Sequence, residues 1–367
     1  MKLKVLQEDL NKAVAQVNRF VNPRVQLPIL GNIVFKATKT KLTLLATNLE
    51  LSISKEIGAD VAEEGEIAVP GKIISEIITN LPKGQVSLES DKEQLKIKAE
   101  SFTGTVSGMN TTDFPKIVQS LGKENIALSV KELSEALAKV SFCSSVDETR
   151  PVLNGVLFLF RKKNLFLVAT DGFRLSQKII SLDKETDLDR VILPKSAIME
   201  LLRSGDLGTE IKLEVKSKEN QVVFGVGDTV VSSRIISGDF PNFENIIPKN
   251  PQTKVYTNKE ELLRVIKLSS VFARDNANMT KLEITKDSIK VSAESSKSGK
   301  QEGKVEAKVE GEGLEIIFNY RFVEELLNVL SGDEVEMEFV NTTTAGLFKD
   351  IKDKDFLHLI MPVKLQS

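Results

Sequence analysis

The stretch Leu42–Asn48 reads LTLLATN, and the stretch Leu165–Asp171, which begins 123 residues later, reads LFLVATD. Both begin with apolar residues at a period of two, which is typical of a β-strand that buries one face. In the second stretch Asp171 precedes Gly172, a pair that favours a turn. Nearly the same strand therefore occurs twice, which predicts that a larger unit is repeated around it.

Five further matches occur in the same order at offsets of 123 to 126 residues. They pair Leu10–Ala13 with Leu133–Ala136, Leu30–Asn32 with Leu153–Gly155, Val69–Lys72 with Leu193–Ser196, Val86–Glu89 with Ile211–Glu214, and Asp113–Pro115 with Asp239–Pro241. Matches that keep both their order and a nearly constant offset are improbable by chance. The first and middle parts of the chain are therefore predicted to be homologous.

A weaker third copy lies 124 or 125 residues beyond the second. It comprises Ile289–Ala293, Phe318–Asn319 and Val335–Glu338. We therefore predict three homologous domains, 1–121, 122–250 and 251–367. Their boundaries fall near Gly122–Asn125 and Pro248–Pro251, which read as loops.

Each repeat reads as an α+β unit. After a short strand, apolar residues recur at i, i+3, i+4 and i+7, the core face of a helix: Leu10, Ala13, Val14 and Val17. A second helix follows Pro70, and its copy follows Pro194. Hairpin-length links favour antiparallel pairing, so each domain is predicted to hold two helices and about eight mostly antiparallel strands. Thr257–Glu260 reads as a capping box at the start of a helix.

The composition indicates a globular protein. Of 367 residues, 41% are hydrophobic, which is enough for several cores. The longest apolar runs have strand length, whereas a membrane-spanning helix needs about 20 apolar residues. Met1–Val5 alternates like a strand and does not resemble a signal peptide. We therefore expect a cytoplasmic protein without membrane contact.

Several kinds of chemistry are disfavoured. Cys143 and His358 are the single cysteine and the single histidine, so neither a disulfide nor a Cys/His zinc site can be assembled. His358 lies in the alternating segment Phe356–Ile360 and reads as an ordinary strand residue. The chain lacks a phosphate-binding P-loop, and Phe224–Asp228 reads as a hairpin turn rather than a dinucleotide site. We therefore expect no catalytic residue, cofactor or metal.

Cations recur on the predicted helices and neighbouring loops of every repeat. They are Lys12, Arg19, Arg24 and Lys72; Lys139, Arg150, Lys195 and Arg203; and Lys259, Arg264, Lys267 and Arg321. They could be ordinary solvated residues, since the net charge is −2. Alternatively, they line one surface that attracts phosphates without reading bases. On the second interpretation we predict that Arg24, Lys72, Arg150 and Lys195 face DNA. Aromatic residues make up only 5%, which argues against a single-strand stacking platform.

Over its whole length the chain resembles the beta subunit of bacterial DNA polymerase III, the sliding-clamp family. The resemblance is carried by Leu27–Asn32, Ala169–Leu175, Gly238–Pro241, Ile247–Lys249 and Met361–Leu365, in that order and spacing. It implies a non-enzymatic protein that encircles duplex DNA as a head-to-tail homodimer, a ring of six domains with helices lining the hole. The implied partners are double-stranded DNA of any sequence, the polymerase III alpha subunit, the clamp loader and other proteins with clamp-binding motifs.

The resemblance also implies two sites. The dimer interface would use Thr103, Gly104 and Val106 on one edge, with Phe272 and Ala273 on the other. Gly104 stands where related clamps can place a bulky apolar residue. The partner-peptide pocket would comprise Leu153, Thr170, Gly172, Phe173, Arg174, Leu175, Pro241, Asn245, Ile246, Leu359, Met361, Pro362 and Val363. Phe173 and Asn245 depart from the His or Tyr and the Arg that are common at those positions.

A hydrolase that uses carboxylates such as Asp171 and Asp239 is the alternative from a different class. Asp171 beside Gly172 is better explained as a turn residue. The sequence therefore favours a binding protein over an enzyme.

Overall fold

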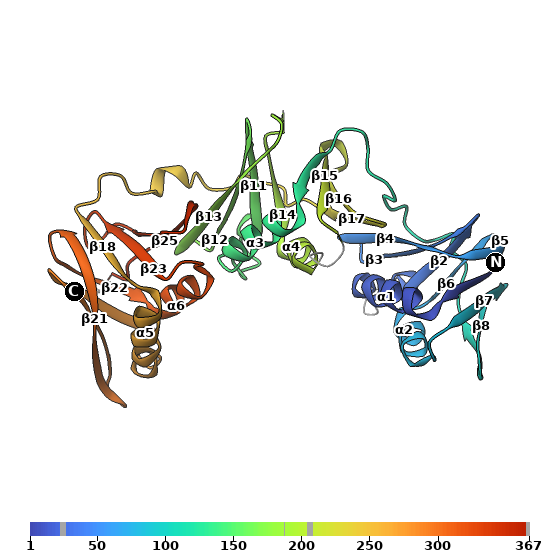
Figure 1. The fold of residues 1–367 in the computed structure, drawn as a ribbon, viewed down its shortest axis with the longest axis horizontal. Coiled ribbons are helices and arrows are strands. Elements are labelled where there is room, and N and C mark those ends of the chain that lie inside the picture. The colour runs from blue at the N-terminus through green and yellow to red at the C-terminus, as the bar shows by residue number, and fades with distance from the viewer. Residues whose placement is uncertain (23–26, 187, 204–207, 365–367) are drawn as a thin grey trace. The chain divides into compact units, whose positions relative to one another are not determined.

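The computed structural model describes residues 1–22, 27–186, 188–203 and 208–364. By its internal contacts the chain forms two compact units (Figure 1), Met1–Val130 with Arg203–Ile235, and Lys131–Leu202 with Ile236–Ser367. The middle repeat contributes residues to both units.

The described residues form six α-helices and 25 strands, distributed evenly over the repeats. The first repeat contains α1 (Gln7–Val17), α2 (Gly71–Asn80), β1 (Lys2–Leu6), β2 (Asn32–Thr38), β3 (Lys41–Thr47), β4 (Leu51–Gly58), β5 (Asp60–Glu63), β6 (Gly65–Pro70), β7 (Gln85–Asp91), β8 (Gln94–Ala99) and β9 (Phe102–Ser107). The second contains α3 (Val130–Ser141), α4 (Lys195–Leu202), β10 (Ile126–Ser129), β11 (Gly155–Arg161), β12 (Asn164–Thr170), β13 (Arg174–Ser181), β14 (Arg190–Pro194), β15 (Glu210–Lys216), β16 (Gln221–Val226) and β17 (Thr229–Arg234). The third contains α5 (Lys259–Ala273), α6 (Tyr320–Val329), β18 (Thr253–Asn258), β19 (Met279–Ile284), β20 (Ser288–Ser295), β21 (Gly299–Gly311), β22 (Leu314–Asn319), β23 (Glu334–Phe339), β24 (Gly346–Asp350) and β25 (Asp353–Ile360).

The α+β prediction is confirmed. Each repeat has two helices and eight or nine strands within the described residues. In all three sheets, neighbouring strands of the described chain run antiparallel. No helix in the described ranges is long and apolar enough to cross a membrane.

The turn after β12 is held by side-chain hydrogen bonds to the backbone. The Thr170 hydroxyl donates to the Arg174 carbonyl (2.6 Å) and accepts from the Gly172 N–H (3.0 Å). The Asp171 carboxylate accepts from the N–H groups of Phe173 and Arg174 at 2.9 and 3.1 Å. Gly172 adopts a φ of +94°, which glycine tolerates without strain. The Ala-Thr-Asp-Gly sequence therefore determines this turn locally.

The same turn recurs in the other repeats. In the first, Thr47 donates to the Leu51 carbonyl, and Asn48 accepts from the N–H groups of Glu50 and Leu51. In the third, Ser295 occupies the corresponding position, and its hydroxyl accepts from two following backbone N–H groups. The threefold repetition seen in the sequence thus extends to individual hydrogen bonds.

Strand pairs join successive repeats, and we call these two pairs seams. The first seam pairs β17 with β4, so that Ser232 lies opposite Ser52. The second seam pairs β13 with β25, so that Leu175 lies opposite Leu359. The first seam completes an eight-stranded sheet in one unit, and the second completes a twelve-stranded sheet in the other. Each seam extends a sheet from one repeat into the next.

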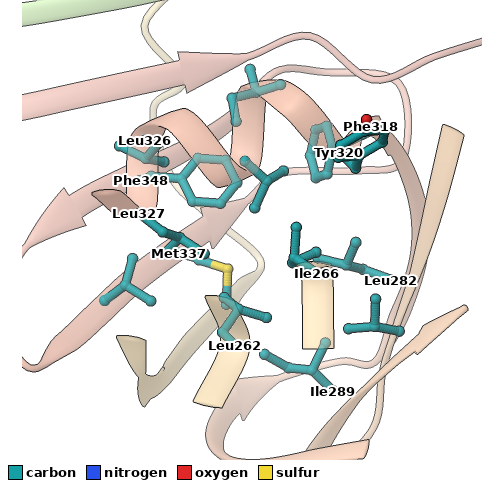
Figure 2. Packing of buried hydrophobic residues seen from close by; sticks show 14 of the residues in the cluster. Leu262, Ile266, Leu282, Ile289, Phe318, Tyr320, Leu326, Leu327, Met337 and Phe348 are labelled. Atoms are coloured by element: carbon teal, nitrogen blue, oxygen red, sulfur yellow. The ribbon is translucent and has the colours of Figure 1, made fainter. Parts of the chain in front are cut away.

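Helix α5 shows how the helices cover the sheets. Its N-cap is Asn258, whose side chain accepts from the Glu261 N–H, so the capping box predicted to start at Thr257 was placed one residue too early. The Thr257 hydroxyl instead donates to the Glu306 carbonyl. Figure 2 shows Leu262 and Ile266 of α5 within the core of the third repeat, which also holds leucines of α6. Apolar burial of this kind is the main stabilising contribution in each repeat.

Candidate functional site

An apolar floor lies beside the second seam. Leu175 and Leu359 face one another across β13 and β25, and each is 1% exposed. They belong to one cluster with Phe240 and Phe243, whose rings meet edge to face at 6.4 Å. The structure therefore brings together predicted pocket residues that are 184 positions apart in the sequence.

Large apolar side chains remain exposed at the rim of this floor. Phe173 is 59% exposed, Ile246 47% and Met361 40%. The Met361 N–H donates to the Phe173 carbonyl at 2.8 Å, which holds these two rim residues side by side. The Ile246 N–H donates to the carbonyl of Phe243, a floor residue, at 3.2 Å. Exposed apolar groups beside an apolar floor typically mark a binding surface. We call Phe173, Ile246 and Met361 the rim.

The remaining predicted pocket residues differ in their exposure. Leu153 and Thr170 are buried, at 5% and 6% exposed. Pro241 and Asn245 are exposed, and Pro362 and Val363 are half-buried. The Val363 N–H donates to the Ile317 carbonyl at 2.8 Å, so the segment after β25 is anchored through its backbone.

Arg174, which was predicted to line the pocket, uses its side chain for hydrogen bonds within the chain. It is 9% exposed, and its guanidinium donates to Asp171 (3.0 Å), to Glu325 of α6 (2.6 Å) and to the Phe142 carbonyl (3.1 Å). It also lies over the Phe322 ring, 4.5 Å from its centroid. These bonds fix the turn and join two repeats.

A polar cluster is buried beneath this turn. The Ser176 hydroxyl lies 2.6 Å from His358 Nδ1 and 3.2 Å from Cys143 Sγ. The His358 ring stacks on Phe142 at 5.6 Å and is 0% exposed. Burial, with the nearby Arg174 charge, lowers the pKa of His358 to about 3, and burial raises the pKa of Cys143 to about 12. His358 and Cys143 are therefore neutral at pH 7 and enclosed, which suits a core and not a nucleophilic site.

The carboxylates considered for hydrolysis have separate partners. Asp171 pairs with Arg174, whereas Asp239 is 91% exposed and pairs with Arg190. The described residues contain no group of three or more His, Cys, Asp or Glu side chains suited to hold a metal ion. Asp171 and Asp239 therefore do not form a carboxylate pair of the kind used in acid–base catalysis.

The second helix of each repeat has a cation in its first turn. Lys72, Lys195 and Arg321 are exposed in the first turns of α2, α4 and α6. None of these turns contains an acidic residue, whereas the first turns of α1, α3 and α5 all do. A cation at a helix N-terminus opposes the helix dipole, so helix stability does not explain this pattern. A helix N-terminus with an added cation attracts anions.

Other predicted cations have different surroundings. Arg150 is about half exposed and pairs with Asp147. Arg24 lies outside the described residues. Lys139 is mostly buried and pairs with Asp353 at 2.6 Å, and Lys259 is also mostly buried. The prediction that Lys139 and Lys259 belong to a solvated basic surface was therefore wrong.

The predicted interface residues divide into accessible and buried ones. Thr103 is exposed on β9, but Val106 is 5% exposed and Ala273 0% exposed, so these two side chains pack inside the chain. The Phe102 ring fills the space above Gly104, where an added Cβ would come within 2.6 Å of it. A neighbouring aromatic ring thus occupies the place of the missing side chain.

Two exposed apolar residues of α5 were not among the predicted interface residues. Leu268 and Val271 are 54% and 56% exposed, and they lie off the face that carries Leu262, Val265 and Ile266. The helical period alone could have separated them from the core face, because they break its i, i+3, i+4 spacing.

Comparison with known proteins gives a consistent match. Models of the DNA polymerase III beta subunit match the chain in succession, the N-terminal domain over residues 1–118, the central domain over 127–242 and the C-terminal domain over 244–364. A beta sliding clamp of Staphylococcus aureus is 31% identical over 365 residues, which covers 96% of this chain and 97% of that protein.

Solved structures are similar over the whole chain. The DNA polymerase sliding clamp from Bacillus subtilis is 26% identical with a TM-score of 0.95, and the match covers 100% of both chains. The DNA polymerase III beta subunit from Thermotoga maritima is also 26% identical over 100% of both chains, with a TM-score of 0.91.

The buried histidine predicts a pH dependence of stability. Because the folded state holds the pKa of His358 near 3, the unfolded chain, with a pKa of about 6.5, takes up a proton first as the pH falls. Its contribution to stability is therefore complete above pH 6.5 and declines at lower pH. Urea unfolding at pH 7 and pH 5 should show that wild type loses about 2 kcal/mol more than His358→Gln over this interval. Equal losses in the two proteins would contradict this prediction.

Proposed function

The chain belongs to the family of bacterial DNA polymerase III beta subunits, the beta sliding clamps, and we propose that two copies close into a ring around duplex DNA. The role of such a ring is to tether the replicative polymerase and other DNA-processing proteins without catalysis of its own. Two copies of three clamp domains give a ring of six.

Two open strand edges carry the proposal of a ring. In both seams the last strand of one repeat pairs with the fourth strand of the preceding repeat, β17 with β4 and β25 with β13. The last strand of the first repeat, β9, is the edge of its sheet. In the fourth strand of the third repeat, β21, residues 299–306 pair only with β20 among the described strands. Open edges favour pairing with another chain, so β9 of one copy and β21 of the other would form an equivalent seam.

Side chains near these edges support the same contact. Helix α5 packs on β20 and β21, and Val265 of this helix lies against Gly303. On the exposed side of α5, Leu268 and Val271 would bury apolar surface against the second copy. We propose Leu268, Val271, Thr103 and the Phe102–Gly104 pair as interface residues, together with Phe272, which is partly buried against the core of the third repeat. Val106 and Ala273 would support them from the core. The contact is heterologous and closes because the two copies are related by a twofold axis.

The DNA-facing surface is proposed to include the second helices of the repeats. Lys72, Lys195 and Arg321 lie at helix N-termini, where their charge adds to the helix dipole in attracting phosphate. Arg150 lies on an exposed loop and adds a further cation. Such contacts are independent of sequence, which suits a protein that moves along DNA.

The partner site is proposed to be the rim and floor of the second seam. The polymerase III alpha subunit, the clamp loader and other partners would insert apolar side chains of short motifs between Phe173, Ile246 and Met361. Each buried Leu or Phe side chain contributes about 1.5–3 kcal/mol. Asn245 would lie beside a bound peptide and influence its preferred sequence.

We retain the domain boundaries 1–121, 122–250 and 251–367 as part of this proposal. The first boundary falls between β9 and β10, and the second between β17 and β18. We also propose that the protein acts in the bacterial cytoplasm, where the chromosome is replicated. Recovery of the protein with membranes after cell fractionation would contradict that location.

The ring predicts a dimer in solution. Sedimentation equilibrium should give twice the chain mass of 40.6 kDa. Leu268→Asp with Val271→Asp should weaken each of the two contacts of the ring about 10²–10⁴-fold, because each contact loses the burial of two side chains, about 1.5–3 kcal/mol each. Ile351→Asp, at a similarly exposed position, is the control. A wild-type monomer at all concentrations would contradict the ring, and an intact double-variant dimer would contradict the role of α5.

If the cations in the first turns of α2, α4 and α6 contact phosphates, replacing them should change the salt dependence of DNA binding. Lys72→Glu, Lys195→Glu and Arg321→Glu together should weaken binding to a short fluorescent duplex. The slope of log K against log salt should become shallower by about 0.9 for each phosphate that the variant no longer neutralises. Lys39→Glu, Lys92→Glu and Lys162→Glu make the same charge change in exposed hairpin turns and serve as the control. Equal slopes for the two triple variants, measured by anisotropy, would argue against this surface.

If the rim binds partner motifs, truncating its side chains should weaken motif binding without destabilising the fold. Phe173→Ala with Met361→Ala should weaken binding of a Leu- and Phe-containing peptide roughly 10- to 100-fold, since about 1.5–3 kcal/mol of apolar burial is removed. Both side chains are exposed, so the melting temperature should barely change. Ile351→Ala, which is as exposed as Met361 at 40%, is the control for isothermal titration calorimetry. Unchanged affinity in the double variant would refute the assignment of the site.

A further inference from the structure

The two seams are built alike in their backbones. Glu50 corresponds to Phe173 by the offset of 123 residues, and Arg234 lies where Met361 lies on the opposing strand. The Arg234 N–H donates to the Glu50 carbonyl at 2.9 Å, just as the Met361 N–H donates to the Phe173 carbonyl at 2.8 Å. The turn hydrogen bonds of Thr47 also repeat those of its counterpart in the second seam. The first seam is therefore a second copy of the framework that carries the proposed motif site.

The first seam also has a hollow and an apolar base. A cavity of about 130 Å³ is lined in part by Thr47, Ser52, Ile117, Ser232 and Arg234. Beside it lies a buried apolar cluster that includes Val34 and Leu45, with Phe114 and Ile117 packed against it. By the repeat offset of 126 residues, Phe114 and Ile117 correspond to Phe240 and Phe243 of the second seam. The framework alone therefore does not exclude an apolar motif from the first seam.

The centres of the two seams differ in chemistry. Ser52 and Ser232 stand where the second seam has Leu175 and Leu359. Their hydroxyl oxygens lie 2.6 Å apart, and both residues are buried. A hydroxyl pair that is already hydrogen-bonded offers an incoming Leu or Phe side chain less apolar contact than two leucines do.

The rims differ still more. The second seam exposes Phe173 and Met361, whose burial by a ligand is favourable. The first seam exposes the charged side chains of Glu50 and Arg234 at the same positions. An apolar motif lying over these charges would have to remove their water without replacing its hydrogen bonds, which is unfavourable.

We propose that Glu50, Ser52, Ser232 and Arg234 are specificity-determining residues that close the first seam to apolar motifs. Each chain then offers one motif site, although it contains two frameworks able to hold one. This inference rests on the proposed function of the second seam.

The test is binding stoichiometry in the full-length protein. The probe is acetyl-Ser-Leu-Ser-Leu-Phe, titrated to saturation by isothermal titration calorimetry. Wild type should bind one peptide per chain. Glu50→Phe, Ser52→Leu, Ser232→Leu and Arg234→Met together should bind two. Adding Phe173→Glu and Met361→Arg to this quadruple variant should return the number to one, with the remaining site at the first seam.

The outcomes separate this inference from the proposed function. Two peptides per wild-type chain, or a folded quadruple variant that still binds one, would overturn the inference. No binding to wild type would instead refute the motif site itself. If the quadruple variant fails to fold, Glu50→Phe with Arg234→Met changes only exposed rim residues and should itself bind a second peptide. Its failure to do so while folded, even at saturating peptide, would overturn the role given to Glu50 and Arg234.

Discussion

An unpaired strand edge carries N–H and C=O groups that need water or another strand as partners. In this chain β17 meets β4 and β25 meets β13, so backbone hydrogen bonds join each repeat to the next. These bonds do not depend on side-chain identity, which explains why repeats with different side chains keep one register. In the proposed ring, the contact with a second copy would extend the same interaction from within the chain to the dimer.

Because the backbone joins the repeats, the side chains at the two seams can differ without breaking the sheets. The first seam is polar at its centre and charged at its rim, whereas the second has leucines beneath exposed Phe173 and Met361. Arg174 adds a connection that the first seam lacks, since Leu51 occupies its position there. Its bonds to Asp171 and Glu325 fix the turn that presents Phe173. A shared framework thus supports one apolar binding surface instead of two.

The sequence predicts well what is determined locally or by repetition. The α+β class and the turn around Asp171 follow from short-range patterns, and a residue offset identifies the repeats. Long-range pairing leaves no such signal, which is why Lys139 was assigned to a solvated surface, although Asp353, its partner, lies 214 positions away. The inward side chain of Arg174 was missed for the same reason. Helical periodicity assigns residues to faces but does not say whether the outer face meets water or protein, so Leu268 and Val271 went unnoticed.

The distribution of charge matters more than its sum in a protein of this kind. A net charge of −2 would disfavour a protein that had to hold DNA by ionic attraction alone. A closed ring holds DNA by topology, so its cations need only keep the duplex centred, and tight contacts would slow sliding. The structure fits this requirement, because acids occupy the first turns of α1, α3 and α5 but are absent from those of α2, α4 and α6. In the proposed ring, the first turns of α2, α4 and α6 would therefore offer phosphates a positive charge that no acidic residue in the same turn offsets.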